Sequence, residues 1–453
     1  MQEKAPDEKD GRSRIARSSH SPRAQWPSVR PSGGLRLLAV VLLVWILWVV
    51  RDRQFLWFLG DLRVYVDGGN VFRTDPSQLY VTQLGGWLSL PFTYPPFAAL
   101  VFSLFSWLPF GLLKIGSVVL ALLSLIACAL AVLTAGGRRL SSGTIGMALA
   151  LAALSWLTEP VQQTLSFGQV NLALMALVTV DILVIRGRAR GVGVGIAAGF
   201  KLVPLIFIPY LILIRAYRAA AMATGVFLGT ILIPFLLAPG ASESYWGGLF
   251  LQGASRVAGN SRVSNQATYA VLLRLYGTSS LAKVLWLACC VLIAGVGLYA
   301  ASRQFHRGRH SLALFSAAVV GLLASPLSWS HHWVWIEILV AAILVEARGM
   351  PRAWRTVLAS GVLLTFLAWP IHLLGRPLAP GGVIWFMPHS NGVEAQWHGW
   401  ELFFGNLYPI LGVGYLLAAF TSVLWRDKGA VAPWRSPVAE PATPRRAASP
   451  LPV

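Results

Sequence analysis

Residues 111–134 read GLLKIGSVVLALLSLIACALAVLT, an apolar run in which Lys114 is the only charged residue. As an α-helix, a run of this length crosses the roughly 30 Å apolar core of a lipid bilayer. Apolar and polar residues do not alternate along it, which excludes a strand of a membrane β-barrel. The stretch therefore predicts a membrane-spanning helix.

Comparable apolar runs recur along the chain. Of its 453 residues, 56% are hydrophobic and only 12% are charged, whereas soluble domains carry about 25% charged residues. The runs lie at 35–50, 111–134, 143–157, 170–186, 220–238, 281–302, 311–325, 334–347, 356–374 and 401–424. We therefore expect an all-α, polytopic transmembrane protein with about 10–12 spans.

Charge is distributed unevenly between these runs. The chain has 37 Lys and Arg against 17 Asp and Glu, a net charge of +20, and most Arg clusters fall between runs or in the tails. This pattern follows the positive-inside rule, so it indicates a cytoplasmic membrane side and no nucleic-acid partner. We expect residues 1–34 and 426–453 to be disordered cytoplasmic tails that flank a membrane domain at 35–425.

Two stretches do not fit a single span each. Residues 96–134 are too long for one span and contain Pro109, so we expect a helix at the outer interface over 96–108, followed by a true span. Residues 192–214 have Arg on both sides and are broken at Lys201-Leu202-Val203-Pro204. A re-entrant hairpin of two half-length helices, with Lys201 near its apex, keeps both flanks inside. The alternative is one kinked span in which Lys201 snorkels to the interface.

Chemically reactive side chains gather in the segments predicted to be external. These segments are 51–95, 157–169, 239–280, 325–333 and 375–400. Outside the tails, nearly every carboxylate lies in or beside them, as do five of the 8 histidines. The three cysteines lie in apolar runs without disulfide or metal spacing, and we expect no metal or other cofactor. The asymmetry predicts a site on the extracytoplasmic face.

Asp61 is the strongest candidate for chemistry at that face. It lies in residues 60–65, GDLRVY, directly after the first apolar run. A lipid-linked sugar donor carries its own activated phosphate, so one carboxylate suffices to take a proton from an acceptor hydroxyl. Two alternatives stay open: Asp61 only solvates a loop, or Asp67 is the reactive carboxylate.

Cationic and imidazole side chains are candidates for neutralising a departing phosphate. Arg274 lies on the predicted outer side, where Arg is rare, and Lys201 lies at the hairpin apex. His331 and His332 follow the turn at 325–329, SPLSW. Neighbouring residues on a helix point about 100° apart, so we expect one of the two histidines to face a cavity. The sequence offers this pair no clear third metal ligand.

Several short motifs occur in a fixed order along the chain. They are DLRVY at 61–65, LY at 79–80, FTYPPF at 92–97, GQVN at 168–171, GFKLVP at 199–204, NQ at 265–266 with Arg274 following, and SPLSW at 325–329 running into His331 and His332. Together they resemble glycosyltransferase family 87, the polyprenol-phosphate-mannose-dependent α-1,2-mannosyltransferases of the GT-C class. The motifs extend from residue 61 to residue 333, and the C-terminal third matches in hydropathy only.

The resemblance implies a GT-C-like fold and an inverting transfer of mannose, in α-1,2 linkage, from a polyprenyl-phosphate donor. The acceptor would be a glycolipid or polysaccharide at the extracytoplasmic face of the cell membrane. Asp61 matches the family's catalytic aspartate, and Arg274 matches the family pattern. The alternatives are a polyprenol-phosphate-arabinose-dependent arabinofuranosyltransferase and, in a different class, a lipid-linked sugar flippase.

The predicted site also includes polar residues within the same motifs. We expect Arg274, Lys201, His331 and His332 to bind the donor phosphate. We expect sugar or acceptor contacts from Tyr65, Tyr94, Gln169, Asn171, Asn265 and Gln266. For Gln169 and Asn171, which stand where an outer segment enters a span, capping of that span is the alternative.

Overall fold

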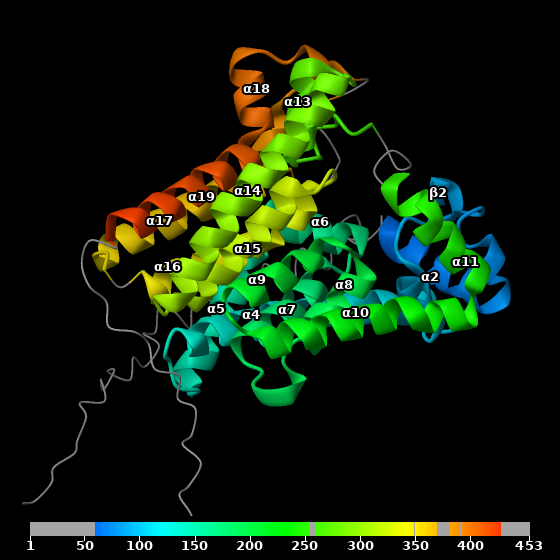
Figure 1. Cartoon of the computed structure of the whole chain (residues 1–453), viewed down its shortest axis with the longest axis horizontal. Coiled ribbons are helices and arrows are strands. Elements are labelled where there is room, and N and C mark those ends of the chain that lie inside the picture. The colour runs from blue at the N-terminus through cyan, green and yellow to red at the C-terminus, as the bar shows by residue number, and fades with distance from the viewer. Residues whose placement is uncertain (1–58, 253–258, 348, 369–380, 390–391, 427–453) are drawn as a thin grey trace, which may run out of the picture.

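The computed structural model describes residues 59–252, 259–347, 349–368, 381–389 and 392–426. Within these ranges the regular elements are helices, apart from one antiparallel hairpin formed by β1 (Gln83–Leu84) and β2 (Leu90–Pro91) (Figure 1). The all-α prediction is therefore confirmed. The predicted tail at 1–34, the apolar run at 35–50 and all of the predicted tail at 426–453 except Arg426, which ends α19, lie outside the described residues.

The helices follow one another with short connections. The N-terminal part holds α2 (Gly60–Thr74), η1 (Pro76–Gln78), η2 (Gly86–Leu88), α3 (Pro96–Ser103), α4 (Phe110–Ala135) and α5 (Ser142–Ser155). The middle part holds α6 (Glu159–Phe167), α7 (Asn171–Leu183), η3 (Gly187–Ala189), α8 (Val192–Phe200), η4 (Val203–Ile206), α9 (Phe207–Leu213), α10 (Tyr217–Leu237), α11 (Pro239–Ser244) and the π-helix η5 (Tyr245–Leu249). The C-terminal part holds α13 (Thr268–Tyr276), α14 (Ser280–His306), α15 (His310–Ala324), η6 (Ser330–Trp335), α16 (Ile336–Glu346), α17 (Arg352–Thr365), η8 (Val383–Phe386), η9 (Val393–Gln396), α18 (Gly399–Gly405) and α19 (Leu407–Arg426).

Four of the described helices, α4, α10, α14 and α19, are long and apolar enough to cross a membrane. The pair α6 and α7, bent by 118° at a short break, adds a fifth if it forms one broken span. Three further apolar helices, α5, η4–α9 and α15, are shorter. The chain is a multi-pass membrane protein, but fewer of its described helices reach full span length than the 10–12 spans expected from the apolar runs.

The predicted division of residues 96–134 at Pro109 is confirmed. α3 ends at Ser103, and Pro109 directly precedes α4. Proline is tolerated at a helix start because the first amide groups of a helix have no intrahelical acceptor. α3 packs against α2 instead of extending α4, so this stretch helps to position the segment that carries Asp61.

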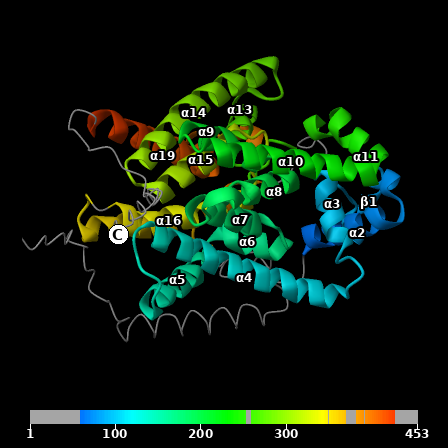
Figure 2. The same ribbon diagram turned by 60° about the horizontal axis from the view of Figure 1, so that its bottom comes forward.

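Residues 192–214 form the predicted hairpin. Three glycines spaced four residues apart lie at the start of α8 and within it. A Cβ added to them would approach α10 to 2.2 Å at Gly191 (Ala219 O), 2.6 Å at Gly195 (Ala223 O) and 2.3 Å at Gly199 (Thr230 Oγ1). The two helices are therefore parallel and in close contact through small residues. After the break at Lys201, α9 returns to the beginning of α10, where the Ala216 amide donates to Leu211 O (2.8 Å) (Figure 2). Lys201 lies at the turn of the hairpin.

Two carboxylates outside the predicted external segments cap helices. Asp181 accepts hydrogen bonds from the backbone amides of Gly191 (2.7 Å) and Val194 (2.9 Å) at the start of α8. Glu346 accepts hydrogen bonds from the Ser311 and Leu312 amides (2.8 and 3.0 Å) at the start of α15. A carboxylate is stabilised at a helix N-terminus by the unpaired amides and the helix dipole, which accounts for these two residues structurally.

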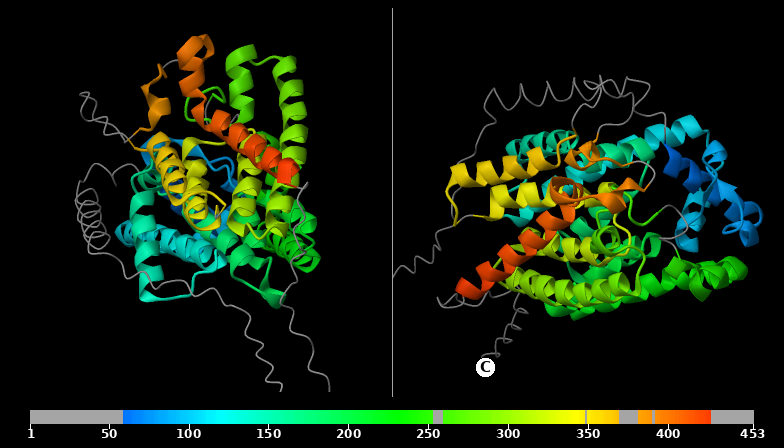
Figure 3. Two further views of the ribbon diagram at one scale, coloured as in Figure 1. Left: turned by 90° about the vertical axis from the view of Figure 1, so that its left-hand side faces the viewer. Right: turned by 90° about the horizontal axis from the view of Figure 1, so that it is seen from above.

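The apolar interior of the described chain includes one large cluster and a smaller one that meet beside Lys201, and a third, minor cluster of Leu59, Leu62 and Val66. The large cluster centres on α15, whose residues 311–323 are all buried. The smaller cluster lies under α2 and α3 and includes Tyr65 and Phe92. Seen from above in Figure 3, α2 and α3 (blue) and α19 (red) lie at opposite ends. Val170 and Phe200 pack against both clusters, so the α6–α7 turn and the hairpin turn lie at their junction.

Candidate active site

Asp61 lies in the first turn of α2, where the helix dipole favours a carboxylate. Leu59, directly before the helix, has a left-handed backbone (φ 33°), and its amide donates to Ser166 O (2.9 Å). This hydrogen bond joins the beginning of α2 to the end of α6. The Asp61 side chain is consequently half-buried beside the α6–α7 turn.

Asp61 belongs to a hydrogen-bonded group that we call the aspartate network, formed by Asp61, Gln169, Tyr65 and Tyr94. Gln169 Nε2 donates to Asp61 Oδ2 (2.7 Å). The Tyr65 hydroxyl donates to Gln169 Oε1 (2.8 Å). Tyr94 lies against the same amide, with its hydroxyl 3.2 Å from Gln169 Nε2. Tyr65 is fully buried and stacks on Phe102 with ring centroids 4.7 Å apart, so the network has a rigid support.

Lys201 belongs to a second group, the lysine network, formed by Lys201, Asn171, His332 and the backbone of His331. Lys201 Nζ donates to Asn171 Oδ1 (2.9 Å) and lies 2.8 Å from His332 Nε2. Asn171 Nδ2 donates to the carbonyl oxygen of His331 (3.0 Å). Only the His332 ring meets the ammonium group, because the His331 ring lies against Phe167 (5.3 Å between centroids). His331 Nε2 and His332 Nδ1 are buried without a partner among the described residues.

The two networks meet at the turn between α6 and α7. Gln169 joins the aspartate network and Asn171, two residues later, joins the lysine network. Lys201 Nζ also lies 5.7 Å from the centre of the Tyr94 ring, within the range of a cation–π interaction. The carboxylate and the ammonium group are therefore held on neighbouring sides of one turn.

Burial determines the protonation of Asp61. Desolvation raises the pKa of Asp61 to about 6, and the hydrogen bond from Gln169 and the charge of Lys201 limit the rise. A carboxylate with this pKa is ionised at neutral pH yet basic enough to take a proton. Burial and the Asp61 charge raise the pKa of Tyr94, so its hydroxyl stays neutral and able to donate.

A cavity of about 40 Å³ opens beside the lysine network. Its polar wall is formed by Asn171, Lys201 and His332. The remaining wall is apolar and includes Leu174, Met175, Val203, Phe207, Leu322 and Trp335. The cavity thus has a cationic end and an otherwise apolar wall.

Arg274 belongs to a separate network in the described structure. Its Nε donates to Ser261 O (3.0 Å), its Nη2 donates to Arg262 O and Asn265 O (2.6 and 2.7 Å), and its Nη1 donates to the Asn406 side chain. The guanidinium also lies 5.2 Å from the Trp397 ring. Because Arg274 is buried and four of its five N–H groups have protein acceptors, this geometry favours a structural role over the predicted phosphate contact.

Asn265 and Gln266 are fully buried in the same region. Asn265 Oδ1 accepts from the Ser328 amide (2.9 Å), and Asn265 Nδ2 donates to Asn260 O (2.9 Å). Gln266 Nε2 donates to Val263 O and Gly405 O (2.7 and 2.8 Å). Both side chains connect backbone segments to one another, a geometry that gives no support to the sugar contacts predicted for them. Of the predicted site residues, the structure brings together Asp61, Tyr65, Tyr94, Gln169, Asn171, Lys201, His331 and His332.

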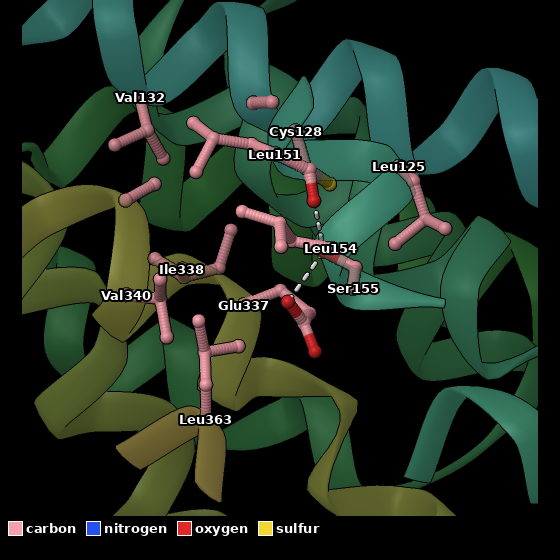
Figure 4. Close-up of a pocket in the computed structure, with 12 residues that line it drawn as sticks. Leu125, Cys128, Val132, Leu151, Leu154, Ser155, Glu337, Ile338, Val340 and Leu363 are labelled. Carbon is pink, nitrogen blue, oxygen red and sulfur yellow. Dashed lines mark hydrogen bonds between the residues drawn. The ribbon is translucent and has the colours of Figure 1, made fainter. Parts of the chain in front are cut away.

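Two buried carboxylates were not predicted as functional residues. Glu159 accepts hydrogen bonds from Ser330 (2.6 Å), Trp385 (3.0 Å) and Tyr408 (3.0 Å). Glu337 binds the Ser155 and Thr158 hydroxyls beside a small apolar pocket that also holds Cys128 (Figure 4). The sequence could have pointed to Glu337, because it is a carboxylate within the apolar run 334–347. Among the described residues, no three His, Cys, Asp or Glu side chains are grouped so that they could hold a metal ion.

The chain matches the model of glycosyltransferase family 87 over residues 92–326, more than half of its length. It belongs to glycosyltransferase family 87. The matched range of this family member contains Tyr94, Gln169, Asn171 and Lys201, and Asp61 precedes it. No solved structure matches the chain.

Named relatives are similar to this family member over most of its length. A polyprenol-phosphate-mannose-dependent alpha-(1-2)-phosphatidylinositol mannoside mannosyltransferase of Mycobacterium tuberculosis (strain ATCC 25618 / H37Rv) is 33% identical over 71% of this chain and 77% of its own. A protein of the same name from Mycolicibacterium smegmatis (strain ATCC 700084 / mc(2)155) is 31% identical over 78% and 86% of the two chains. A polyprenol-phosphate-mannose-dependent alpha-(1-2)-phosphatidylinositol pentamannoside mannosyltransferase from M. smegmatis is 30% identical over 80% and 91%. The chain is thus similar to mannosyltransferases with two different acceptor names.

Proposed function

We propose that this protein transfers mannose, in α-1,2 linkage, from polyprenol-phosphate-mannose to a mannosylated phosphatidylinositol. The observation that carries the proposal is a half-buried carboxylate, Asp61, held beside the half-buried Lys201 and the buried His332 at one end of an apolar cavity. The names of the relatives support mannose over arabinofuranose as the sugar.

In the proposed reaction, Asp61 acts as the general base. It takes the proton of the acceptor hydroxyl while that oxygen attacks the anomeric carbon of mannose. The bond between this carbon and the phosphate oxygen breaks, and its electron pair leaves with polyprenyl phosphate. Because the new bond forms opposite the leaving group, the configuration at the anomeric carbon is inverted. The pKa of Asp61, about 6, suits this role at neutral pH.

The lysine network is the proposed binding site for the donor phosphate. Lys201 supplies a cation, and the Nδ1 atom of His332 is buried without a partner among the described residues. A buried polar atom of this kind is costly unless a ligand or water meets it, and a phosphate oxygen would satisfy it as a charge-assisted acceptor. The apolar wall of the adjoining cavity would take the first part of the polyprenyl chain.

We assign the reaction to the extracytoplasmic face. Arg186, Arg188 and Arg190 lie before the start of α8, and Lys201 lies at its other end. Since the positive-inside rule assigns the Arg cluster to the cytoplasm, the hairpin carries Lys201 towards the opposite side. A polyprenyl-phosphate donor and a lipid acceptor would both reach Asp61 from the outer leaflet.

The test is sugar transfer by the purified full-length protein in detergent. Polyprenol-phosphate-mannose and polyprenol-phosphate-arabinose would be compared as donors, with phosphatidylinositol mannosides of different lengths as acceptors. We expect transfer from the mannose donor and a loss of roughly 10²–10⁴-fold in Asp61→Asn. Asp67→Asn is the matched control, because Asp67 lies on the same helix but accepts only the Gly85 amide in the described structure (2.9 Å). Undiminished transfer by Asp61→Asn, or transfer from the arabinose donor alone, contradicts the proposal.

A further inference from the structure

The Gln169 side chain is already engaged on both of its polar atoms. Its Nε2 donates to Asp61 Oδ2 (2.7 Å) and lies 3.2 Å from the Tyr94 hydroxyl. Its Oε1 accepts from the Tyr65 hydroxyl (2.8 Å). A side chain used in this way has little capacity left for a sugar hydroxyl. Its contacts are those of a residue that acts on Asp61.

The orientation of the Gln169 amide is fixed by α2 itself. Tyr65 lies four residues after Asp61, so both side chains lie on one face of the helix. The Tyr65 hydroxyl occupies Gln169 Oε1, which leaves Nε2 to face the carboxylate. Tyr65 is fully buried and stacked on Phe102, so it resists rotation. One turn of α2 therefore supplies both the Asp61 carboxylate and the Tyr65 hydroxyl, which orients the Gln169 amide that donates to Asp61.

Asn171 is held towards Lys201 in the same way as Gln169 is held towards Asp61. Its Nδ2 donates to His331 O (3.0 Å), and this bond turns Oδ1 towards Lys201 Nζ (2.9 Å). His331 O also accepts from the Thr164 hydroxyl (3.2 Å) on α6, so the carbonyl is held from two sides. Asn171 is 7% exposed, and both of its polar groups are used within the protein.

The turn that carries both amides is seated directly on α2. Gly168 has a left-handed backbone (φ 68°), and a Cβ placed on it would lie 2.6 Å from Leu62 Cβ. Any other residue at this position would push the turn away from the segment that holds Asp61. The contact therefore fixes the distance between the turn and the helix.

We propose that the turn Gly168-Gln169-Val170-Asn171 is a positioning device, in which Gln169 positions Asp61 and Asn171 positions Lys201. This inference rests on the proposed function, since it assigns Asp61 as the base and Lys201 as the phosphate ligand. Gln169 and Asn171 are positioning residues that act through those two groups, in place of the sugar contacts expected from the sequence. The sequence spacing of the two amides then sets the separation between base and cation.

The first test measures the pH dependence of mannose transfer in Gln169→Glu. The titratable groups around Asp61 are Tyr65, Tyr94 and Lys201, and the substitution adds a carboxylate beside them. We expect kcat to fall about 10–100-fold and the acidic limb of the profile to move up by about one pH unit, because a like charge disfavours ionisation of Asp61. The KM for donor and acceptor should stay unchanged. A raised KM with an unmoved acidic limb would instead indicate sugar binding and overturn the inference.

The second test is a double-mutant cycle between Asn171 and Lys201. Asn171→Leu should raise the donor KM about tenfold in the wild-type background. In a Lys201→Met background it should have no further effect, because the interaction that Asn171 supports is already gone. Additive effects in the double mutant would show that Asn171 acts independently of Lys201, against the proposal.

Controls separate this inference from the function on which it rests. Gln78→Glu makes the same chemical change at an exposed position on η1 and should leave the profile unchanged. If Asp61→Asn retains transfer, the proposed function fails. If Asp61→Asn is inactive but Gln169→Glu keeps the wild-type acidic limb, only the positioning role fails. Should Gln169→Glu not fold, Tyr65→Phe removes the hydrogen bond that orients the amide and should lower kcat without raising the donor KM.

Discussion

Asp61 combines ionisation with basicity because its surroundings act in opposite directions. Burial disfavours the charged form, and Gln169 and Lys201 favour it, so that the pKa of Asp61 settles at about 6. A fully solvated aspartate has a pKa near 3.9 and would be a weaker base, and a buried aspartate without partners would be protonated at neutral pH. Because the pKa of Asp61 depends on particular side chains, substitutions of those side chains should change it.

The pH dependence of transfer follows from this pKa. As the proposed base, Asp61 must be ionised to accept a proton, so we expect activity to be full well above pH 6, half-maximal near pH 6 and lost as the pH decreases further. Below that point we expect kcat/KM to drop about tenfold per pH unit, as for a single essential base. The measurement is a profile between pH 4.5 and 8 in detergent, checked for reversibility at pH 7. Activity that stays at its maximum down to pH 4.5 would contradict the burial-raised pKa.

A substitution of Lys201 should weaken binding of the sugar donor and leave binding of the acceptor unchanged. Its ammonium group lies in the polar wall of the apolar cavity, and a charge-assisted hydrogen bond to phosphate contributes roughly 1.5–3 kcal/mol. Lys201→Met should therefore raise the donor KM about 10–100-fold and leave the acceptor KM nearly unchanged. Lys283→Met, at an exposed position near the start of α14, is the control. An unchanged donor KM in Lys201→Met would remove Lys201 from the phosphate site.

At the scale of elements, the sequence predicted where helices are interrupted better than it predicted which side chains contact one another. Pro109 and Lys201-Leu202-Val203-Pro204 mark the observed breaks, because proline and a charge within an apolar run act locally. The contact between Gln169 and Asp61 joins residues 108 apart, and no local pattern encodes it. Asn265, Gln266 and Arg274 have the residue types of a binding site, and only the structure shows that their polar groups face the protein backbone.

The α6–α7 turn offers a prediction at this scale. Gly168→Ala should lower kcat about 10–100-fold, because the added Cβ would meet Leu62 and shift the turn away from α2. Gly392→Ala is the matched control: Gly392 has a similar left-handed backbone (φ 79°), and its Cβ would meet nothing within 4 Å. Both variants carry the strain of a left-handed alanine, about 1 kcal/mol. Equal activity of the two would show that the contact with α2 is not needed for catalysis.

At the scale of the whole molecule, buried polar networks join segments that are distant in sequence. Glu159 on α6 binds Ser330 on η6, Trp385 on η8 and Tyr408 on α19. The lysine network joins α7, the hairpin and η6 in the same way. Association between apolar helices in a membrane gains little from the hydrophobic effect, so interhelical hydrogen bonds and close packing fix their arrangement. The site is therefore held by contacts spread over most of the described chain.

Arg274 was predicted from the sequence to bind the donor phosphate, whereas its hydrogen bonds in the structure favour a role in holding distant segments together. Its donors hold the backbone at Ser261, Arg262 and Asn265 and the side chain of Asn406, which ties the segment before α13 to the start of α19. Arg274→Met leaves these acceptors without a donor, at a cost of roughly 1–3 kcal/mol for each that stays buried. We expect a clearly lower Tm in detergent, with an unchanged donor KM when transfer is assayed well below that Tm.

Arg262→Met provides the comparison for Arg274→Met, because the Arg262 side chain is exposed and the hydrogen bonds of Arg262 in the described structure are made by its backbone. It should leave both the Tm and the donor KM near their wild-type values. If Arg274 is instead a phosphate ligand, Arg274→Met will keep its Tm and raise the donor KM. The two measurements thus assign Arg274 either to the donor site or to the contacts that tie the segment before α13 to the start of α19, and the described hydrogen bonds favour the second.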